Sequence, residues 1–475
     1  MAITAMRFSR PVAFALALLC CGGVARAQLG DGGGGAGAGG VTIDAAGGLT
    51  VKSDRRLGSR AEVKRRQALA GEQLPADLNR ASDFRKVSLV KLEAALADRL
   101  AKGETPTDAM ANLAGLTRID YVFVVPAAAG EDGAPTPGDV ILAGPAGGFA
   151  PDGLGRVVNA ATGRPTVKLA DFLTAVRSGP RLSCSIDPVP ARRAQMARAA
   201  AGRRPSTSLA GAAAVYRQLA DILGLQNIRV EGVPAGSPFG VKLVEADYRL
   251  KLFSLKLEPT GVRGLPSYLD VIRPGGDSAK RWELVPSYQP VVTNADRTAF
   301  ALTGPRVRLL SRDEVIGPDG VARDAGDLAQ SEHAWANLVS SRMDELAAAK
   351  PAFAALQNLF DLAILTELVK RERLADRTAW PAALFRDPGK LPVPEGNAPK
   401  TVPTAYNTKT VGGSLVIGLI SGGVSINPAE VLAETSETGD SSGTLSAARD
   451  SAVTPPADAD SEAGGEEDAV RWWWD

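Results

Sequence analysis

The chain has 475 residues, of which 45% are hydrophobic and 23% charged, an ordinary composition for a globular protein with room for two or three packed units. Its formal net charge is +1 and it has one histidine, which excludes most zinc sites because these use several His or Cys ligands. Arginine is scattered without interleaved aromatic residues, which argues against nucleic-acid binding.

The first 27 residues have the three parts of a signal peptide. Arg7 and Arg10 precede the apolar run Val12–Cys21, and Ala25-Arg26-Ala27 supplies the small-x-small cleavage pattern. The apolar run is shorter than the ~20 residues that cross a bilayer. We therefore expect cleavage after Ala27 and export to the periplasm or the extracellular space, with no transmembrane span in the mature chain.

Two further features follow from this processing. Of the three cysteines only Cys184 would remain, so the mature protein could form no internal disulfide. Residues 28–40 are almost all glycine and alanine and predict a disordered, flexible linker. We find no phosphate-binding loop and no metal-ligand cluster, and the sequence predicts no cofactor.

Residues 41–110 predict a short hairpin followed by a helical segment. Val41, Ile43, Leu49 and Val51 alternate with polar residues around a Gly-containing turn. Residues 59–102 are rich in charge, Ala and Leu, and their apolar positions from 87 to 100 follow helical spacing.

Residues 111–280 predict an α/β core in which strands alternate with helices. The expected strands are 121–125, 139–143, 182–186 and 227–230, and the expected helices are 168–177, 208–223 and 241–257.

Residues 281–315 predict a β meander. Residues 327–375 predict two helices that are split at Lys350-Pro351. Up to residue 426 we expect a C-terminal hairpin, in which Gly422-Gly423 breaks the apolar run that begins at Gly413. From residue 427 the chain consists mainly of small polar and acidic residues, and we expect a disordered tail. The fold class is α+β, with a mixed α/β core, an antiparallel β section and two long helices.

Five segments resemble a planctomycete-type family of secreted proteins that is a domain of unknown function. They are 116–126, 139–149, 182–188, 223–234 and 243–259, and the resemblance extends over residues 41–426. It implies export and a bacterial source of that type. The family has no assigned activity or catalytic residues, so the resemblance transfers no site to this chain.

Cys184 and His333 are the candidate catalytic residues, as the only cysteine and histidine of the mature chain. Their spacing is compatible with a cysteine peptidase pair. However, Cys184 lies in an expected strand between two serines, and free cysteine is a common small buried residue. A structural role for Cys184 is therefore the preferred interpretation.

Other patterns indicate chemistry less specifically. Ser88-Leu-Val-Lys91 and Lys409-Thr-Val-Gly412 partly match motifs of penicillin-recognising enzymes, but the middle element is missing. Ser254/Lys256 and Ser278/Lys280 could form Ser–Lys dyads. A calcium loop is a further alternative, although EF-hand spacing is absent; its acids are Asp313, Asp319, Asp324 and Asp327.

The segment Trp472–Trp474 ends an acidic stretch whose net charge is −9 from Glu434 onward. Exposed tryptophans favour a partner pocket or a membrane interface, although the adjacent acids would repel an anionic surface. A short tail without a partner is the other alternative.

These observations together predict a non-catalytic envelope or extracellular protein with a binding or structural role. The alternative is a secreted hydrolase that uses an acid pair or the Cys184/His333 pair. The partner is unknown; an envelope or extracellular protein or polymer would fit the predicted compartment.

Overall fold

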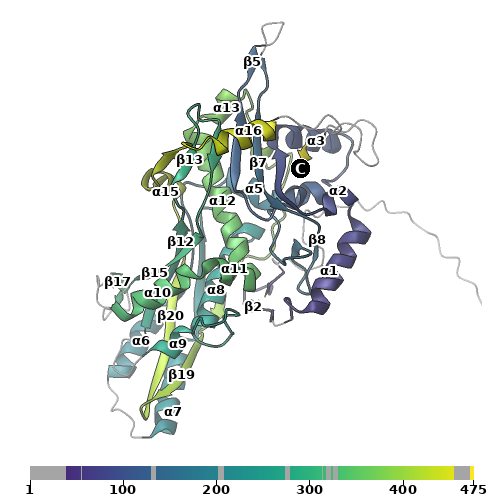
Figure 1. The fold of residues 1–475 in the computed structure, drawn as a ribbon. Coiled ribbons are helices and arrows are strands. Elements are labelled where there is room, and N and C mark those ends of the chain that lie inside the picture. The colour runs from purple at the N-terminus through teal and green to yellow at the C-terminus, as the bar shows by residue number, and fades with distance from the viewer. Residues whose placement is uncertain are drawn as a thin grey trace, which may run out of the picture.

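The computed structural model describes residues 39–54, 56–129, 135–201, 208–272, 279–312, 314–316, 322–324, 330–453 and 471–475. The expected signal peptide and all but the last two residues of the Gly-rich linker lie outside them. The described part is a mixed fold of helices and two seven-stranded sheets, which confirms the expected α+β class (Figure 1).

The first sheet, sheet I, lies in the lower half of Figure 1. Its order is β15-β12-β20-β10-β11-β18, and β19 also pairs with β20. The strands are β10 (Leu182–Pro188), β11 (Leu225–Glu231), β12 (Ala279–Ser287), β15 (Arg306–Arg312), β18 (Thr401–Pro403), β19 (Tyr406–Val411) and β20 (Ser414–Ile426). β12 runs parallel to β20, and the other pairs are antiparallel.

The expected C-terminal hairpin exists, but its turn is Gly412-Gly413 between β19 and β20. Gly422-Gly423 does not break the run: both residues lie inside β20. A Cβ on Gly422 would come 1.9 Å from the Trp282 carbonyl oxygen, and one on Gly423 would come 2.0 Å from that of Cys184. The two glycines therefore allow close approach of the strands on either side.

The second sheet, sheet II, lies in the upper half of the molecule and has the order β21-β13-β14-β4-β7-β3-β22. Its strands are β3 (Ser82–Ser88), β4 (Tyr121–Val125), β7 (Asp139–Ala146), β13 (Val291–Thr293), β14 (Ala299–Ala301), β21 (Glu437–Gly439) and β22 (Trp473–Trp474). The meander expected over 281–315 is thus wrong, because β12 and β15 belong to sheet I whereas β13 and β14 belong to sheet II.

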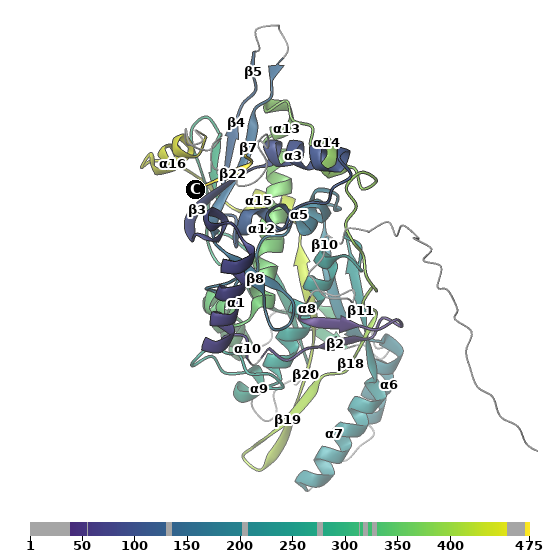
Figure 2. The same ribbon diagram turned by 90° about the vertical axis from the view of Figure 1, so that its right-hand side faces the viewer.

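Short strand pairs complete the β structure and include the expected N-terminal hairpin. They are β1 (Val41–Ile43) with β2 (Leu49–Val51), β5 (Ala128–Ala129) with β6 (Pro135–Thr136), β8 (Phe149–Pro151) with β9 (Val157–Asn159), and β16 (Glu314–Ile316) with β17 (Ala322–Asp324). Figure 2 shows β2 beside β11 and β18 of sheet I.

Helices cover both sheets. α8 lies on β10 and β20, α12 packs against α8 and α5, α10 lies on β15, and α16 lies on β4 and β14. The helices are α1 (Arg60–Gln73), α2 (Ala76–Asn79), α3 (Leu89–Ala101), α4 (Asp108–Ala111), α5 (Leu169–Val176), α6 (Pro190–Ala201), α7 (Leu209–Leu223), α8 (Pro238–Ser254), α9 (Tyr268–Val271), α10 (Gln330–Ser341), α11 (Met343–Ala349), α12 (Pro351–Arg371), α13 (Leu374–Arg377), α14 (Ala383–Arg386), α15 (Pro428–Glu434) and α16 (Thr444–Val453), with the 3₁₀ turn η1 (Leu113–Gly115).

The largest hydrophobic core extends from Val41 to Trp473 and includes residues on both sides of 110/111 and 280/281. The domain boundaries expected there stay predictions. In the described residues, α12 alone is long and apolar enough to cross a membrane, yet 78% of its most apolar window is buried inside the protein. Such burial is what the central helix of a packed core requires.

Residues 59–102 do not form one helical segment, because β3 separates α2 from α3. Residues 85–88 are buried, and β3 pairs with β7 along one side. The apolar spacing from 87 to 100 is helical only within α3, which begins at Leu89. Pairing in the sheet therefore overrides the local helical preference before residue 89.

The expectation of a disordered tail from residue 427 is wrong for its described parts. α15, β21 and α16 occupy most of residues 428–453, and β22 lies in the last described segment, 471–475. The tail has a low average hydrophobicity, but a few of its apolar side chains are buried. They are Leu445, Ala452 and the three tryptophans 472–474. Residues 454–470 lie outside the described residues.

Candidate functional site

Cys184 lies in the middle of β10, between β11 and β20. Its side chain is buried, and burial, followed by the nearby Asp247 carboxylate, raises the thiol pKa well above its ordinary value. A protonated thiol inside a sheet is a poor nucleophile. This position fits a small buried side chain in the packing between sheet I and α8.

His333 belongs to α10, and its side chain lies outside the described residues. α10 packs on β15, and the two strands β12 and β20 lie between β15 and β10 in sheet I. The backbone thus places Cys184 in a strand of sheet I and His333 on a helix that packs against another strand of that sheet. The proposed pairing of their side chains stays a prediction.

The partial penicillin-enzyme motifs have local structural roles. Ser88 is the N-cap of α3, and its hydroxyl accepts a hydrogen bond from the Lys91 backbone N–H at 3.0 Å. Lys409 lies in β19, where its ammonium group donates to the carbonyl oxygen of Asp270 at 2.7 Å. The S-x-x-K pattern is therefore a helix cap.

The remaining candidates are not brought together in the described part. Ser254 is fully buried in α8, whereas Lys256 pairs with Asp270 at 2.7 Å on the surface. In the described residues no group of three His, Cys, Asp or Glu side chains could hold a metal ion. Ser278, Asp313, Asp319 and Asp327 lie outside the described residues, as do the side chains of Lys280 and Asp324.

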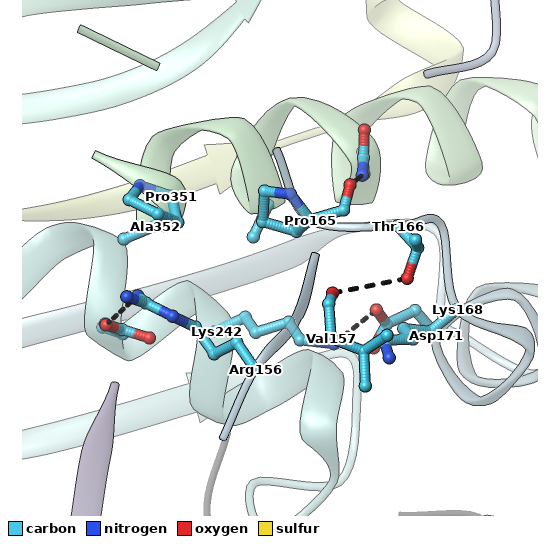
Figure 3. Close-up of a pocket in the computed structure, with 12 residues that line it drawn as sticks. Arg156, Val157, Pro165, Thr166, Lys168, Asp171, Lys242, Pro351 and Ala352 are labelled. Carbon is cyan, nitrogen blue, oxygen red and sulfur yellow. Dashed lines mark hydrogen bonds and ion pairs between the residues drawn. The ribbon is translucent and has the colours of Figure 1, made fainter. Parts of the chain in front are cut away.

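A small cavity lined by charged and apolar residues lies between α5, α8, α12 and the chain around β9 (Figure 3). Arg156 reaches it from the loop before β9 and donates to Asp152 at 2.9 Å and to Glu245 at 3.4 Å. On another wall Lys242 donates to Asp171 at 2.6 Å. Both charge pairs are almost fully buried.

Three buried polar atoms at this cavity have no hydrogen-bond partner in the structure: Arg156 Nη2, Asp171 Oδ1 and Asn358 Oδ1. The accessible volume is about 20 Å³, which is room for about one water molecule. Bridging water is thus the ligand that fits this space. A substrate does not fit without movement of α12.

The cavity borders a buried ionic network. Arg249 donates to Glu245 at 3.3 Å and to Glu258 at 2.9 Å, and Lys350 at the start of α12 contacts the same Glu258. Gly40 enters this network so closely that a Cβ there would come 1.8 Å from Glu245 Oε1. The network therefore fixes the N-terminal hairpin, α8 and α12 relative to one another.

A larger and more open hollow, with an accessible volume of about 460 Å³, lies beneath α16. Its two arginines and two aspartates balance in charge. Arg449 donates to the Val124 carbonyl at 3.2 Å, and Arg377 donates to that of Arg297 at 2.9 Å. Both arginines thus already donate hydrogen bonds to backbone carbonyls. The bond from Arg449 links α16 to β4 of sheet II.

The feature that most resembles a binding site is the outer edge of β3, where the segment 471–475 adds a strand. β22 pairs antiparallel with β3, with Trp473 opposite Val87 and Trp474 opposite Lys86. The Ser88 N–H donates to the Trp472 carbonyl at 2.9 Å. We call β3 with the side chains that contact this segment the β3 edge site.

Trp473 and Trp474 lie on opposite faces of sheet II, and Trp472 belongs to the same hydrophobic core as Trp473. Trp473 belongs to the largest core and lies between two guanidinium groups, with Arg85 4.6 Å and Arg471 4.8 Å from its ring centre. Trp474 packs on the other face with Phe123, and with Leu445 and Ala452 of α16. Such cation–π contacts are stronger when they are buried.

Arg85 holds the end of the segment. Its Nε and Nη2 donate to the two carboxylate oxygens of Asp475 at 2.7 and 2.9 Å. This bidentate arrangement is specific for a planar carboxylate. The Arg85 side chain is fully buried. Its other hydrogen bonds go to the carbonyls of Asp77, Leu78, Arg80 and Ala114.

Sequence reasoning singles out Trp472–Trp474 but slightly favours a short tail without a partner, and it gives no indication of the residues that receive the segment. The receiving residues lie in a segment that was expected to be helical. The pattern that could have indicated it is the short alternation around Arg85 before the Ser88 cap.

Comparison with known families gives one match. Residues 184–268 match a family described as a protein of unknown function, DUF1598. The matched segment runs from Cys184 in β10 to Tyr268, the first residue of α9, and contains α6, α7, β11 and α8. No curated protein and no solved structure matches the chain.

The matched segment supplies one wall of the small cavity through Lys242 and Glu245 of α8, whereas α5 and α12 come from outside it. The β3 edge site lies entirely outside the matched residues. The family match therefore describes part of sheet I and its covering helices and carries no function to the β3 edge.

Proposed function

We propose that the protein is exported and acts without catalysis, as a binding or structural protein of the cell envelope or the extracellular space, and that the β3 edge site is where it binds. The observation that carries the proposal is the strand of the chain's own residues 471–475 on that edge. The signal-peptide pattern at residues 1–27 supports the compartment.

Strand addition is a general mode of peptide recognition. Backbone hydrogen bonds supply affinity, and pockets for alternate side chains supply specificity. The β3 edge site has both parts, because Ser88 and its neighbours pair with the backbone while Arg85 reads a carboxylate. Tryptophan and arginine are also the residues that most often dominate binding energy at interfaces.

The position of Cys184 favours this proposal over a hydrolase. A nucleophile must reach its substrate and be deprotonated or activated by a base. Cys184 is buried between two strands, and its thiol pKa is raised. A reaction at this thiol would require the sheet to open.

The test uses full-length protein in which the chain's own strand is disabled by Trp473→Ser and Trp474→Ser. A fluorescent peptide Arg-Trp-Trp-Trp-Asp should then bind with a saturable rise in anisotropy. The control peptide Arg-Ser-Ser-Ser-Asp and the same protein carrying Arg85→Met as well should both bind at least ten-fold more weakly. If the strand-disabled protein has the circular dichroism of the wild type and does not bind the peptide, the proposal is wrong.

A further inference from the structure

We propose that the partner of the β3 edge site is segment 471–475 of a second copy of this chain, so that copies join by exchange of β22. The inference rests on the proposed function, because it names the partner of the same site. It goes beyond that function because the site would act between molecules as well as within one.

The docked segment is a self-contained ligand. Within five residues it carries the paired backbone of β22, the two aromatic anchors Trp473 and Trp474, and the carboxylate of Asp475 that Arg85 binds. Arg471 adds an ion pair with Asp77 at 3.1 Å. A second copy would bring identical residues, so exchange would preserve each of these contacts. Such exchange of an identical element is a low-cost route to assembly.

The chain between α16 and segment 471–475 is long enough for exchange between two copies. Residues 454–470 connect α16 to the segment, and a fully extended chain of that length spans up to about 60 Å. Exchange competes with the internal arrangement, and the effective concentration of two segments that a short linker joins is of the order of millimolar. We therefore expect exchange where copies are concentrated, and a monomer in dilute solution.

Charge complementarity favours a second copy over an unrelated partner. Lys86 follows Arg85 in β3, and Lys91 is 5.5 Å from the Trp474 ring centre. The residues that would approach with the incoming strand include six acids within 454–470 and Asp475 itself. Opposite charges of this kind raise the rate of encounter and orient the partner.

Two full-length variants separate exchange from internal docking. The strand-disabled variant (Trp473→Ser, Trp474→Ser) keeps the site, whereas the site-disabled variant (Arg85→Met) keeps the strand. Each is labelled with a different fluorophore. Only the mixture should show energy transfer and a dimer mass by light scattering, and unlabelled Arg-Trp-Trp-Trp-Asp peptide should abolish both. Each variant alone should stay monomeric.

A second measurement avoids the risk that a variant misfolds. Wild-type protein with natural isotopes is mixed with ¹⁵N-labelled wild type at about 1 mM, the range in which exchange competes with the internal arrangement. A carbodiimide then joins carboxylates of the acidic chain that ends in segment 471–475 to lysines at the site, such as Lys91, which is 5.5 Å from the Trp474 ring centre. Cross-linked peptides that combine both isotopes are expected, and their share should fall on dilution.

The outcomes distinguish the two proposals. If the strand-disabled variant binds the peptide but the variant mixture forms no dimer and the cross-links never combine isotopes, exchange is wrong and the β3 edge site stands. If folded strand-disabled protein does not bind the peptide, the proposed function fails and this inference fails with it. Dimers that the Arg-Trp-Trp-Trp-Asp peptide does not dissociate, any more than the control peptide does, would also overturn exchange at this site.

Discussion

Arg85 and Asp475 lie 390 positions apart in the chain and form a bidentate ion pair, with N···O distances of 2.7 and 2.9 Å. The guanidinium is fully buried and also bonds four backbone carbonyls around α2 and η1. One residue therefore connects the strand β3, the turns beside it and the last described segment of the chain.

Replacement of Arg85 by methionine should destabilise the protein more than most single substitutions. It leaves the Asp475 carboxylate and the buried carbonyls without their donor, and removal of one partner of a buried pair costs about 3–5 kcal/mol. Chemical unfolding should show this loss as a lower midpoint. Exposed Arg373, which pairs with Asp376 on the surface, provides the control, and Arg373→Met should change stability by about 0.5 kcal/mol or less. Equal effects of the two substitutions would contradict the role of Arg85.

The docking of segment 471–475 should weaken in acid. Burial opposes ionisation of Asp475, but the hydrogen bonds and charge of Arg85 outweigh it, so the pKa of Asp475 is lowered from its ordinary value of 3.8. A group with a lowered folded-state pKa contributes stability that is present above its unfolded pKa and is lost as pH falls through the folded value.

The contribution of Asp475 should thus be complete near neutral pH and should decline as pH falls below about 4. The measurement is the unfolding free energy of wild type and Asp475→Asn between pH 7 and pH 3. Because other carboxylates affect both proteins equally, the difference between the two curves isolates Asp475. That difference should shrink in acid; a difference that is constant or grows would contradict the prediction.

The sequence predicted the local elements of the central region well. The expected helices near 168–177, 208–223 and 241–257 correspond to α5, α7 and α8, and the expected strands correspond to β4, β7, β10 and β11. These segments have strong periodicity and clear Gly or Pro boundaries, so local sequence suffices to define them.

Long-range pairing is where sequence reasoning failed. The glycines 422 and 423 are typical of a turn by composition, yet they lie inside β20 because neighbouring backbones approach there. β3 is a strand because β7 and β22 pair with it, partners that are distant in sequence. The tail was expected to be disordered from its average composition, whereas a few apolar residues at specific positions dock it.

Cys184 should react slowly with thiol reagents in the native protein. The thiol is buried in β10, and burial followed by the charge of Asp247 raises its pKa well above the ordinary value, so little of the reactive thiolate exists at neutral pH. Labelling of Cys184 with a thiol-reactive disulfide, followed by mass spectrometry of its peptide, should be at least 100-fold slower than in denaturant, where this thiol is exposed. Rapid native labelling would restore the nucleophile hypothesis for Cys184.

Removal of residues 471–475 should lower the thermal stability of the protein. Deletion exposes the backbone of β3 and removes three tryptophans that are at most 8% exposed, and burial of a large apolar side chain contributes about 1.5–3 kcal/mol. It also leaves Arg85 without its carboxylate. A decrease in melting temperature of several degrees is expected for a loss of that size in a chain this long.

The control for tail charge is Asp450→Asn, since the Asp450 side chain is 75% exposed in α16 and its loss should leave the melting temperature nearly unchanged. Tryptophan emission gives an independent measure, because three of the six tryptophans lie in the segment. In the wild type they are buried and should emit at short wavelength. Asp475→Ala keeps all six but removes the carboxylate bound by Arg85, and should shift the emission to longer wavelength as the strand is released. If deletion leaves the melting temperature unchanged and Asp475→Ala leaves the emission unchanged, β22 does not stabilise the β3 edge.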